Sequence, residues 1–343
     1  MNYLVSIIIP VYKVEAYIER CLASVMHQTY QDSTIECILV DDCSPDKSVD
    51  IAKGMVNEYR GNVDFVIIRN DENCGLSVAR NNGINHATGK YIFFLDSDDY
   101  LKEDCLQIML ETIALHPDAD MVMGNSHDNR INSPFINYSG KEDYCILDNN
   151  QLLKKFYFEE IPPMAWNSLI SHELIIDNQL SFKPNLIHED NLWASKLFPL
   201  VNKFIFIPRI TLIYEDNPSS IMNSIDIAKD LENRIVIMDE LLKSFNKSHY
   251  VDYTLFLCIS LLRMLDMSKC CGEGMREKVK KQRDQLMKHS LQHGRIVLAV
   301  FELLMYNPMS QLFRFKLLRY NIDKLQRKTY TIASFFNFLH SNK

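Results

Sequence analysis

The sequence predicts an α/β fold in which a mainly parallel sheet is covered by helices on both faces and is followed by a helical C-terminal region. Two observations predict it. Short strand-like apolar runs alternate with segments of helical spacing in the first half, and long helical patterns with almost no strand signal follow from about residue 225. The 343 residues suffice for one large domain with an appendage, or for two domains.

Five strands are expected in the first half of the chain. They are Leu4 to Pro10, Ile35 to Asp41, Val63 to Arg69, Tyr91 to Leu95 and Ala119 to Asn125. The segments between them have helical spacing: Glu15 to Gln28, Asp46 to Tyr59, Leu76 to Ala87 and Glu103 to His116. Ser44, directly before Pro45, is the expected start of the second helix.

The C-terminal region shows three longer helical patterns, Ile227 to Phe245, Val251 to Met267 and Met275 to His289. We place a boundary near residues 220–226. This predicts a sheet domain over residues 1–224 and a helical region over residues 225–343, packed on the sheet domain or lying on a partner surface.

Cysteine usage and hydropathy exclude several classes of protein. The nine cysteines form no CxxC pair and no Cys/His cluster, so we expect reduced, mostly buried thiols in a cytoplasmic protein and no zinc site. The apolar start, Met1 to Pro10, has no basic leader or cleavage site and is interpreted as the first strand, not as a secretion signal. The apolar run from Tyr253 to Leu262 is about half as long as a bilayer span requires.

The charge is distributed unevenly along the chain. From residue 264 onward there are 15 Lys and Arg against 6 Asp and Glu, although the whole chain carries −7. Two segments, Arg295 to Phe301 and Gln311 to Tyr320, mix aliphatic, aromatic and basic residues. This pattern is typical both of a helix on an anionic membrane surface and of a helix packed on its own domain, so peripheral membrane association stays an open alternative.

Acidic residues follow two of the expected strands. Asp41 and Asp42 end one strand, and Asp96, Asp98 and Asp99 follow the apolar run from Tyr91. Because the carboxyl ends of parallel strands share one edge of a sheet, both groups are expected at that edge. An Asp-x-Asp pair offers hard oxygen ligands for Mg²⁺ or Mn²⁺, and such a metal neutralises a departing diphosphate. The alternative is a helix cap or a solvated turn.

Arg80 belongs to a second group of candidate residues, within Asn73 to Gly83. Gly75 precedes the expected helix and leaves its N-terminus open to a ligand. The alternative for Arg80 is a surface ion pair.

Five segments together resemble the inverting glycosyltransferases of family two, of the bacterial polysaccharide type, which have the Rossmann-like GT-A fold. They are Ser6 to Tyr12, Gln28 to Tyr30, Leu39 to Ser44, Asn73 to Gly83 and Tyr91 to Leu101. The resemblance is close over about residues 4–105 and weaker to about residue 221.

The resemblance implies roles for individual residues. Asp96 and Asp98 match the positions that hold Mn²⁺ or Mg²⁺. The positions on the nucleotide side of the donor are Pro10, Tyr12, Asp41, Asp42, Arg80 and Ser97. On the acceptor or donor-sugar side, the resemblance implies Asp99, Trp166 and Asn167.

The resemblance also implies a catalytic base in the segment from His188 to Trp193. Asp190 is the expected base, with Glu189 as the alternative. A positioned carboxylate is needed because a sugar hydroxyl is a poor nucleophile until its proton is taken. Both acids also fit a simple helix cap with dipole compensation.

Two positions depart from the family pattern. Cys43 stands where the family usually has glycine, which puts the turn on the nucleotide side in doubt because cysteine restricts the backbone more than glycine does. Ser168 stands where the family often has lysine, which removes a candidate cation.

The expected function is metal-dependent transfer, with inversion, of a sugar from a nucleotide-diphosphate donor, most simply a UDP-sugar, to a hydroxyl of a glycan or lipid-linked acceptor in cell-surface polysaccharide synthesis. The alternative is a catalytically degenerate nucleotide-sugar-binding or scaffold protein with the same fold. Haloacid-dehalogenase-like phosphatases fit less well, because Tyr100 replaces their usual threonine or valine. No G-x-G-x-x-G or Walker loop is present, and no nucleic-acid partner is expected.

Overall fold

The computed structural model describes residues 3–30, 34–220, 225–243 and 250–292. The chain divides into two compact units, one formed by Met1–Phe156 and Glu160–Asn246 and the other by Tyr157–Glu159 and Lys247–Lys343. The first unit contains the sheet and also one helix, α9 (Ile227–Lys243), that the sequence assigns to the helical region. The predicted boundary at residue 224, between the sheet domain and the helical region, stays a prediction.

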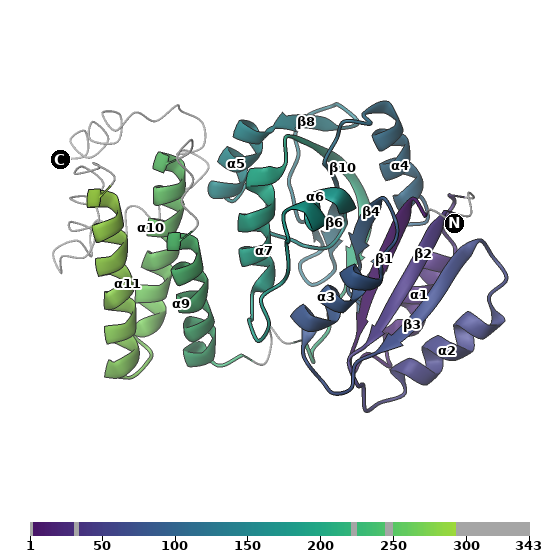
Figure 1. Ribbon diagram of the computed structural model, residues 1–343, viewed down its shortest axis with the longest axis horizontal. Helices are drawn as coiled ribbons and strands as arrows, with labels where there is room; N and C mark the ends of the chain where they lie inside the picture. The colour runs from purple at the N-terminus through teal and green to yellow at the C-terminus, as the bar shows by residue number, and fades with distance from the viewer. Residues whose placement is uncertain (1–2, 31–33, 221–224, 244–249, 293–343) are drawn as a thin grey trace. The chain divides into compact units, whose positions relative to one another are not determined.

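The strands of the first unit follow the expected order (Figure 1). They are β1 (Val5–Val11), β2 (Ile35–Asp41), β3 (Val63–Arg69), β4 (Tyr91–Phe94), β5 (Tyr100–Leu101), β6 (Met121–Asp128), β7 (Ser133–Pro134), β8 (Cys145–Asp148), β9 (Ser168–Ser171) and β10 (Lys203–Tyr214). The five predicted strands are confirmed, each within three residues at either end.

Helices of the first unit lie close to all four segments predicted between the strands, and others lie outside those segments. In chain order they are α1 (Ile18–Met26), α2 (Ser48–Glu58), α3 (Leu76–His86), α4 (Cys105–Leu115), α5 (Asn149–Tyr157), α6 (His172–Asp177), α7 (Glu189–Leu197), the 3₁₀ helix η1 (Phe198–Leu200) and α9. The expected helix start at Ser44 is wrong. Asp46 accepts hydrogen bonds from the backbone N–H and hydroxyl of Ser48, where α2 begins, and Ser44 donates to the same carboxylate.

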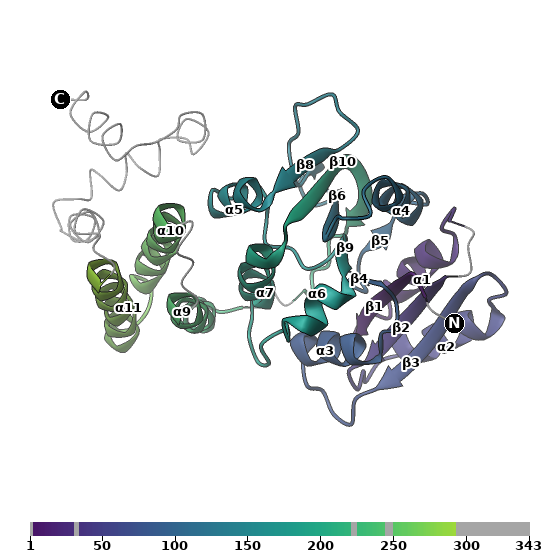
Figure 2. The same ribbon diagram turned by 45° about the horizontal axis from the view of Figure 1, so that its top comes forward.

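The sheet has the strand order β3-β2-β1-β4-β9-β6-β10-β5. The first four strands are parallel, whereas β9 runs antiparallel to both β4 and β6. β10 is parallel to β6 and pairs antiparallel with β5 and β8. Figure 2 shows helices above and below this sheet, and the predicted α/β class is confirmed, with a mixed sheet beyond β4.

Strands β1 and β2 are mostly apolar because both of their faces are covered. Every residue of β1 and β2 is buried, as expected for strands between two layers of helices. Helix α3 packs on β1 closely enough that a Cβ on Gly83 would lie 2.3 Å from a methyl carbon of Ile8. This close approach requires glycine and sets the depth at which α3 carries Arg80.

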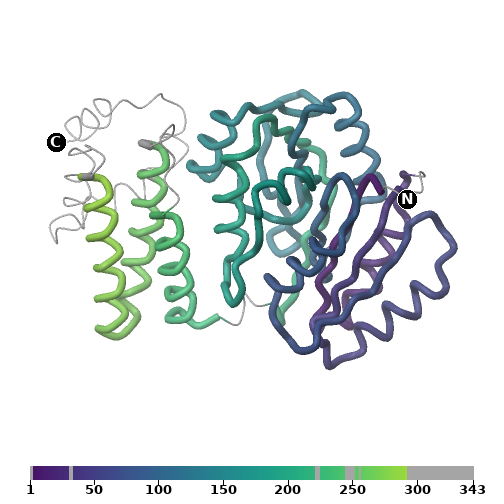
Figure 3. The backbone as a smooth tube through the Cα atoms, in the orientation of Figure 1, coloured from purple at the N-terminus to yellow at the C-terminus, as the bar shows by residue number. Residues whose placement is uncertain are grey.

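The chain direction brings the candidate residues to one edge of the sheet. β1, β2 and β4 are parallel, and β6 runs in the direction of β4 because both are antiparallel to β9. The carboxyl ends of β1, β2, β4, β6 and β10 therefore share an edge, as the backbone path in Figure 3 shows. Loops at such an edge form the binding sites of α/β proteins.

The described part of the second unit is a helix pair. Helices α10 (Tyr250–Ser268) and α11 (Glu273–Gln292) pack side by side (Figures 1 and 2). Tyr157 packs its ring against Tyr253 and Phe256, and Arg263 forms a two-pronged ion pair with Glu159. No helix within the described residues is long and apolar enough to cross a membrane. The basic segments 295–301 and 311–320 lie outside the described residues.

Candidate active site

Arg80 joins the two acidic motifs of the candidate site. Its side chain is only 2% exposed, which excludes the alternative of a surface ion pair. Nη2 lies 2.6 Å from Oδ1 of Asp96, and Nη1 lies 2.6 Å from Oε1 of Glu189. A guanidinium suits this bridge because its planar fork presents two donors in fixed directions. Arg80 thus holds the acid after β4 and the first residue of α7 at one place.

Aromatic side chains form the surroundings of Arg80. Its guanidinium lies 5.2 Å from the ring centroid of Phe182, and that ring stacks on Trp193 of α7 at 4.1 Å. Burial opposes the charge on Arg80, but the carboxylates of Asp96 and Glu189 outweigh it and raise the pKa of the guanidinium further above its ordinary value. Nε is buried without a hydrogen-bond partner among the described residues.

Three carboxyl groups crowd the turn after β4. Burial and the nearby charge of Asp96 raise the pKa of Asp98, although the side-chain amide of Asn217 donates to Asp98 Oδ2 at 2.8 Å. Asp99 is more deeply buried, and burial together with Asp98 and Asp96 raises its pKa well above the ordinary value. Like charges held this closely favour a proton or a cation among them.

The pair Asp96 and Asp98 fits a divalent cation of the Mg²⁺ or Mn²⁺ kind. Asp96 contacts Arg80 through Oδ1 and Asp98 contacts Asn217 through Oδ2, so a second oxygen of each group remains as a candidate ligand. Among the residues that the structure describes, no group of three or more His, Cys, Asp or Glu forms a metal cage. Two carboxylates with water and phosphate oxygens are the usual ligands of Mg²⁺ at phosphate sites.

The two candidate bases differ in what they contact. Glu189 accepts a hydrogen bond from Arg80, whereas Asp190 accepts one from the backbone N–H of Asn191 at 2.9 Å. Burial, followed by the charge of Glu189, raises the pKa of Asp190 to about 7. A carboxylate with such a pKa is a much better proton acceptor than an ordinary aspartate.

Helix α9 fixes the backbone that enters α7. His188 has a left-handed backbone, with φ of 63°, and its Nε2 lies 2.8 Å from Oδ1 of Asp230. Asn233 accepts the backbone N–H of Ile187, and Arg234 also contacts Asp230. Sequence reasoning missed these α9 residues, because nothing in their local pattern indicates a contact with a segment about 40 positions earlier.

The paired aspartates on the nucleotide side organise loops. Asp42 accepts the backbone N–H groups of Cys74 and Gly75 and the side-chain amide of Asn70. Asp41 accepts the backbone N–H of Ser44 and lies 3.5 Å from Arg69. Both side chains are buried. They therefore fix the turn after β2 and the loop before α3, which border the expected nucleotide position.

The other expected nucleotide-side residues differ in exposure. Pro10 and Ser97 are buried, whereas the ring of Tyr12 is exposed. Cys43, at the position where relatives usually have glycine, has φ of 57°. The turn thus keeps the left-handed backbone that glycine adopts easily, at a cost of ~1–2 kcal/mol for a residue with a side chain.

The side chain of Asn167 makes contacts inside the sheet. It is fully buried, donates to Ser126 and to the carbonyls of Gly124 and Asn125, and accepts from the hydroxyl of Thr211. With its donors and acceptor occupied, Asn167 supports the strands, and its expected place on the sugar side stays a prediction.

Trp166 and Asp99, the other residues expected on the sugar side, are also buried. Trp166 stacks on Tyr214 at 5.7 Å and packs against Phe135. Asp99 accepts the backbone N–H of Glu215 at 2.9 Å. Both therefore help to build the wall of the site, and a direct contact of either with a sugar stays a prediction.

The segment after β10 supplies residues that sequence reasoning left without a role. Asn217 donates to Asp98, Glu215 donates to Asp99 through its backbone, and Arg20 pairs with Glu215 at 2.8 Å. The weaker family resemblance that extends to about residue 221 was the available signal. It indicated a segment and no individual contact.

Comparisons with known proteins identify the family to which the chain belongs. The family model of glycosyl transferase family 2 matches residues 6–173. The glycosyltransferase GlyA of Streptococcus pneumoniae is 30% identical over 225 residues, 63% of this chain, and the chain spans 31% of GlyA's length. A glycosyltransferase of Haemophilus influenzae is 33% identical over 192 residues, which cover 54% of this chain and 68% of that protein. The teichoic acid biosynthesis protein GgaB of Bacillus subtilis is 39% identical over 115 residues, 34% of this chain and 12% of GgaB.

A solved structure shows the same fold. Residues 1–349 of TarS from S. aureus, in complex with UDP-GlcNAc, superimpose with a TM-score of 0.61 at 22% identity, covering 83% of this chain and 79% of that one. The resemblance derived from the sequence and the predicted GT-A fold are thereby confirmed. The chain is a glycosyltransferase and belongs to glycosyl transferase family 2.

Proposed function

We propose that this enzyme transfers a sugar, with inversion, from a UDP-sugar to a hydroxyl group of a glycan or lipid-linked acceptor in cell-surface polysaccharide synthesis. The main support is the pair of salt bridges made by Arg80. They bring Asp96 and the Glu189–Asp190 segment together at the carboxyl ends of the parallel strands, where α/β proteins bind ligands. GgaB, by its name a teichoic acid biosynthesis protein, and TarS, solved with UDP-GlcNAc, support the kind of acceptor and donor.

The donor side of the proposal uses the loops after β1, β2 and β4. The turn held by Asp41 and the loop held by Asp42 border the nucleoside, with the exposed ring of Tyr12 as a stacking surface. Asp96 and Asp98 would hold Mn²⁺ or Mg²⁺. When bound, that cation neutralises the charge that develops on the departing diphosphate.

The acceptor side uses Asp190 as the base. Asp190 takes the proton of the acceptor hydroxyl while that oxygen bonds to the anomeric carbon and the bond from this carbon to the diphosphate oxygen breaks. Attack from the side opposite the leaving group inverts the anomeric centre. The raised pKa of Asp190 supports this role.

Glu189 is a positioning residue in this account. Its Oε1 is bound to Arg80, so it fixes the direction of α7 and keeps a negative charge beside Asp190. Asp230 and Asn233 of α9 restrain the same segment from the other side.

Release of UDP from a panel of UDP-sugars in Mn²⁺ tests the proposal. We expect turnover by the wild type and a loss of ~10²–10⁴-fold in Asp190→Asn, the range of general-base catalysis. Asp177→Asn, at an exposed position of α6, is the matched control and retains turnover. Equal turnover by Asp190→Asn and the wild type would remove Asp190 from the mechanism. Transfer from another nucleotide sugar but from no UDP-sugar, with the same acceptor present, would exclude UDP as the donor nucleotide.

A further inference from the structure

A pocket lies outside the acidic centre, between the segment 134–139 and strands β6 and β10. It has a volume of about 370 Å³, within the range of small-ligand pockets. Asn125, His127, Asn137, Tyr138 and Ser139 supply polar groups to its lining, and prolines and isoleucines supply the rest.

Strand register places this pocket on the face of the sheet that carries α7. Pairing through β9 puts Val122 on the same face as Phe93. Side chains alternate between the two faces along a strand. Asn125 and His127 lie three and five residues beyond Val122 on β6, so they lie on the opposite face from Val122, which is also the face of Phe94. The ring of Phe94 packs against α7, the helix of the candidate base.

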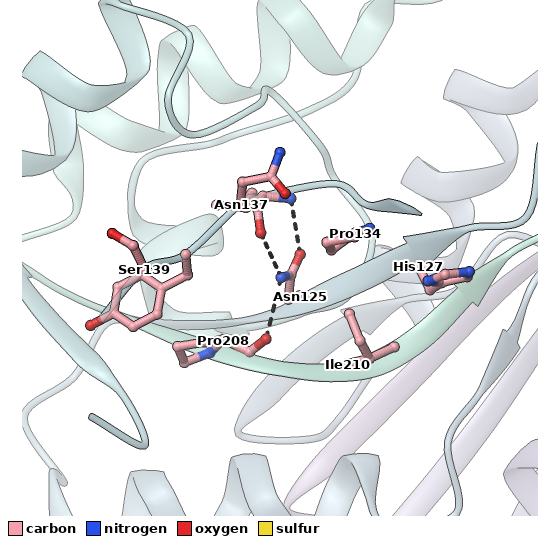
Figure 4. A pocket seen from close by; sticks show the side chains of 9 residues that line it. Asn125, His127, Pro134, Asn137, Ser139, Pro208 and Ile210 are labelled. Carbon is pink, nitrogen blue, oxygen red and sulfur yellow. Dashed lines mark hydrogen bonds between the residues drawn. The ribbon is translucent and has the colours of Figure 1, made fainter. Parts of the chain in front are cut away.

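Asn125 builds the floor of the pocket and joins its walls. Its side-chain amide donates to the carbonyls of Ile136 and Pro208 and accepts the backbone N–H of Ile136 (Figure 4). These bonds hold the segment 134–139 against β10. The amide of Asn125 is occupied in this way, the hydroxyl of Tyr138 donates to Glu142, and Nε2 of His127 lies 3.1 Å from Oδ1 of Asn132. Ligand recognition therefore falls to Asn137, Ser139, the second ring nitrogen of His127 and the ring face of Tyr138.

The lining contains no Asp, Glu, Lys or Arg. Arg209, which lies between two lining residues of β10, pairs with Asp104 and is not part of the lining. A phosphate or nucleotide site needs cationic side chains or a cluster of backbone N–H groups. Neutral hydrogen-bonding groups with an aromatic ring and apolar surfaces instead match a sugar, which presents hydroxyl groups and C–H faces.

The position of the pocket relates it to the acidic centre. Along β10, Ile210 at the pocket and Tyr214 at the strand end are about 13 Å apart at 3.3 Å per residue. The next residue, Glu215, donates its backbone N–H to Asp99. At the other end of the pocket, His127 pairs with Ile213, directly before Tyr214, so the pocket extends from near the strand end to a point more than one sugar ring away from it.

We propose that this pocket binds a neutral sugar residue of the acceptor glycan, at a distance from the hydroxyl that reacts. The proposal deepens the proposed glycosyl transfer and rests on it. It assigns to Tyr138, Asn137 and His127 a role in choosing acceptors, separate from donor binding.

Saturation-transfer NMR on the full chain tests the pocket with neutral disaccharides, namely cellobiose, lactose, maltose and diacetylchitobiose, and with glycerol 3-phosphate as an anionic probe. We expect at least one disaccharide to bind, with its signal lost in Tyr138→Ala, which removes the aromatic wall, and in Asn137→Trp, which narrows the pocket. Ile131→Ala, at an exposed position outside the lining, is the control that keeps the signal. Thermal unfolding verifies that each variant is folded.

Three results would overturn the proposal: no disaccharide binds at millimolar concentration, binding persists in both pocket variants, or glycerol 3-phosphate alone binds there. A parallel titration of the wild type with UDP and Mn²⁺ separates failure of the pocket proposal from failure of the proposed function. UDP binding without disaccharide binding rejects only the pocket. Disaccharide binding without UDP binding rejects the donor assignment and leaves a saccharide site.

Discussion

Arg80 and Glu189 are separated by 109 residues in the sequence and are joined by an ion pair of 2.6 Å between Nη1 and Oε1. The same guanidinium contacts Asp96 through Nη2 at 2.6 Å. Since Arg80 is buried, the two carboxylates are its counter-charges as well as its hydrogen-bond acceptors. One side chain therefore ties the expected metal motif to the helix of the expected base.

Substitution of Arg80 tests this coupling. Arg80→Met leaves two carboxylates without their partner, so we expect a loss of ~3–5 kcal/mol in the free energy of unfolding, measured in urea. Arg80→Lys keeps the charge but cannot present two donors in a fixed fork, and it is expected to lose turnover while losing less stability. Arg60→Lys, at an exposed position, is the control. A stability of Arg80→Met equal to that of the wild type would show that the bridge contributes nothing.

Glu189→Gln separates positioning from proton transfer. The neutral amide keeps one acceptor for Arg80 but removes a charge from beside Asp190, so turnover is expected to fall less than in Asp190→Asn. The pH at which turnover is half-maximal should also move lower, because the charge of Glu189 helps to raise the pKa of Asp190. If Glu189→Gln lost as much turnover as Asp190→Asn and the pH profile did not move, Glu189 would be the better candidate for the base.

The pKa of Asp190 also predicts how stability depends on pH. The folded value of about 7 lies above the ordinary 3.8, so the folded protein binds this proton more tightly and its stability falls as pH rises between the two values. Asp190→Asn removes that loss, so the variant should be more stable than the wild type by up to ~4 kcal/mol at about pH 8 and similar to it at about pH 4. Thermal unfolding at the two pH values measures the difference, and a variant less stable at the higher pH would contradict the assignment.

Asp230 of α9 is expected to act on the reaction without touching the substrate. Asp230→Ala frees His188 and loosens the start of α7, so kcat should fall about 10-fold, on the scale of lost positioning contacts, with KM for the donor nearly unchanged. Lys229→Ala, at the exposed neighbouring position, is the matched control. A fall in kcat shared equally by both variants would indicate a general effect on α9.

The sequence was most informative where the pattern is local and repeated. Short apolar runs predicted β1, β2 and β3, and the rule that parallel strands end at one edge predicted that Asp42 and Asp98 would share that edge. The short antiparallel strand β9 was not predicted as a strand. Its four residues are too few to show a period, and it forms because β4 and β6 both need a partner.

The contacts that complete the site depend on tertiary structure. No local pattern indicates that Arg80 reaches Glu189, that Asp230 holds His188, or that Asn217 donates to Asp98. Nor does any local pattern indicate that Asn167 donates to Ser126 and accepts from Thr211. A polar residue inside a family motif can satisfy buried backbone groups and need not face the substrate.

Calorimetric titration with UDP tests the central claim most directly. The wild type and Asp98→Ala are titrated in Mn²⁺ and again in excess EDTA, and GDP, dTDP and AMP are the comparator ligands. The control variant is Asp71→Ala, at an exposed position outside the acidic turn. We predict that UDP binds in preference to the comparators, that EDTA weakens this binding, and that Asp98→Ala loses it while Asp71→Ala retains it. UDP binding that is unaffected both by EDTA and by Asp98→Ala would contradict the role of Asp98 in holding the metal and diphosphate.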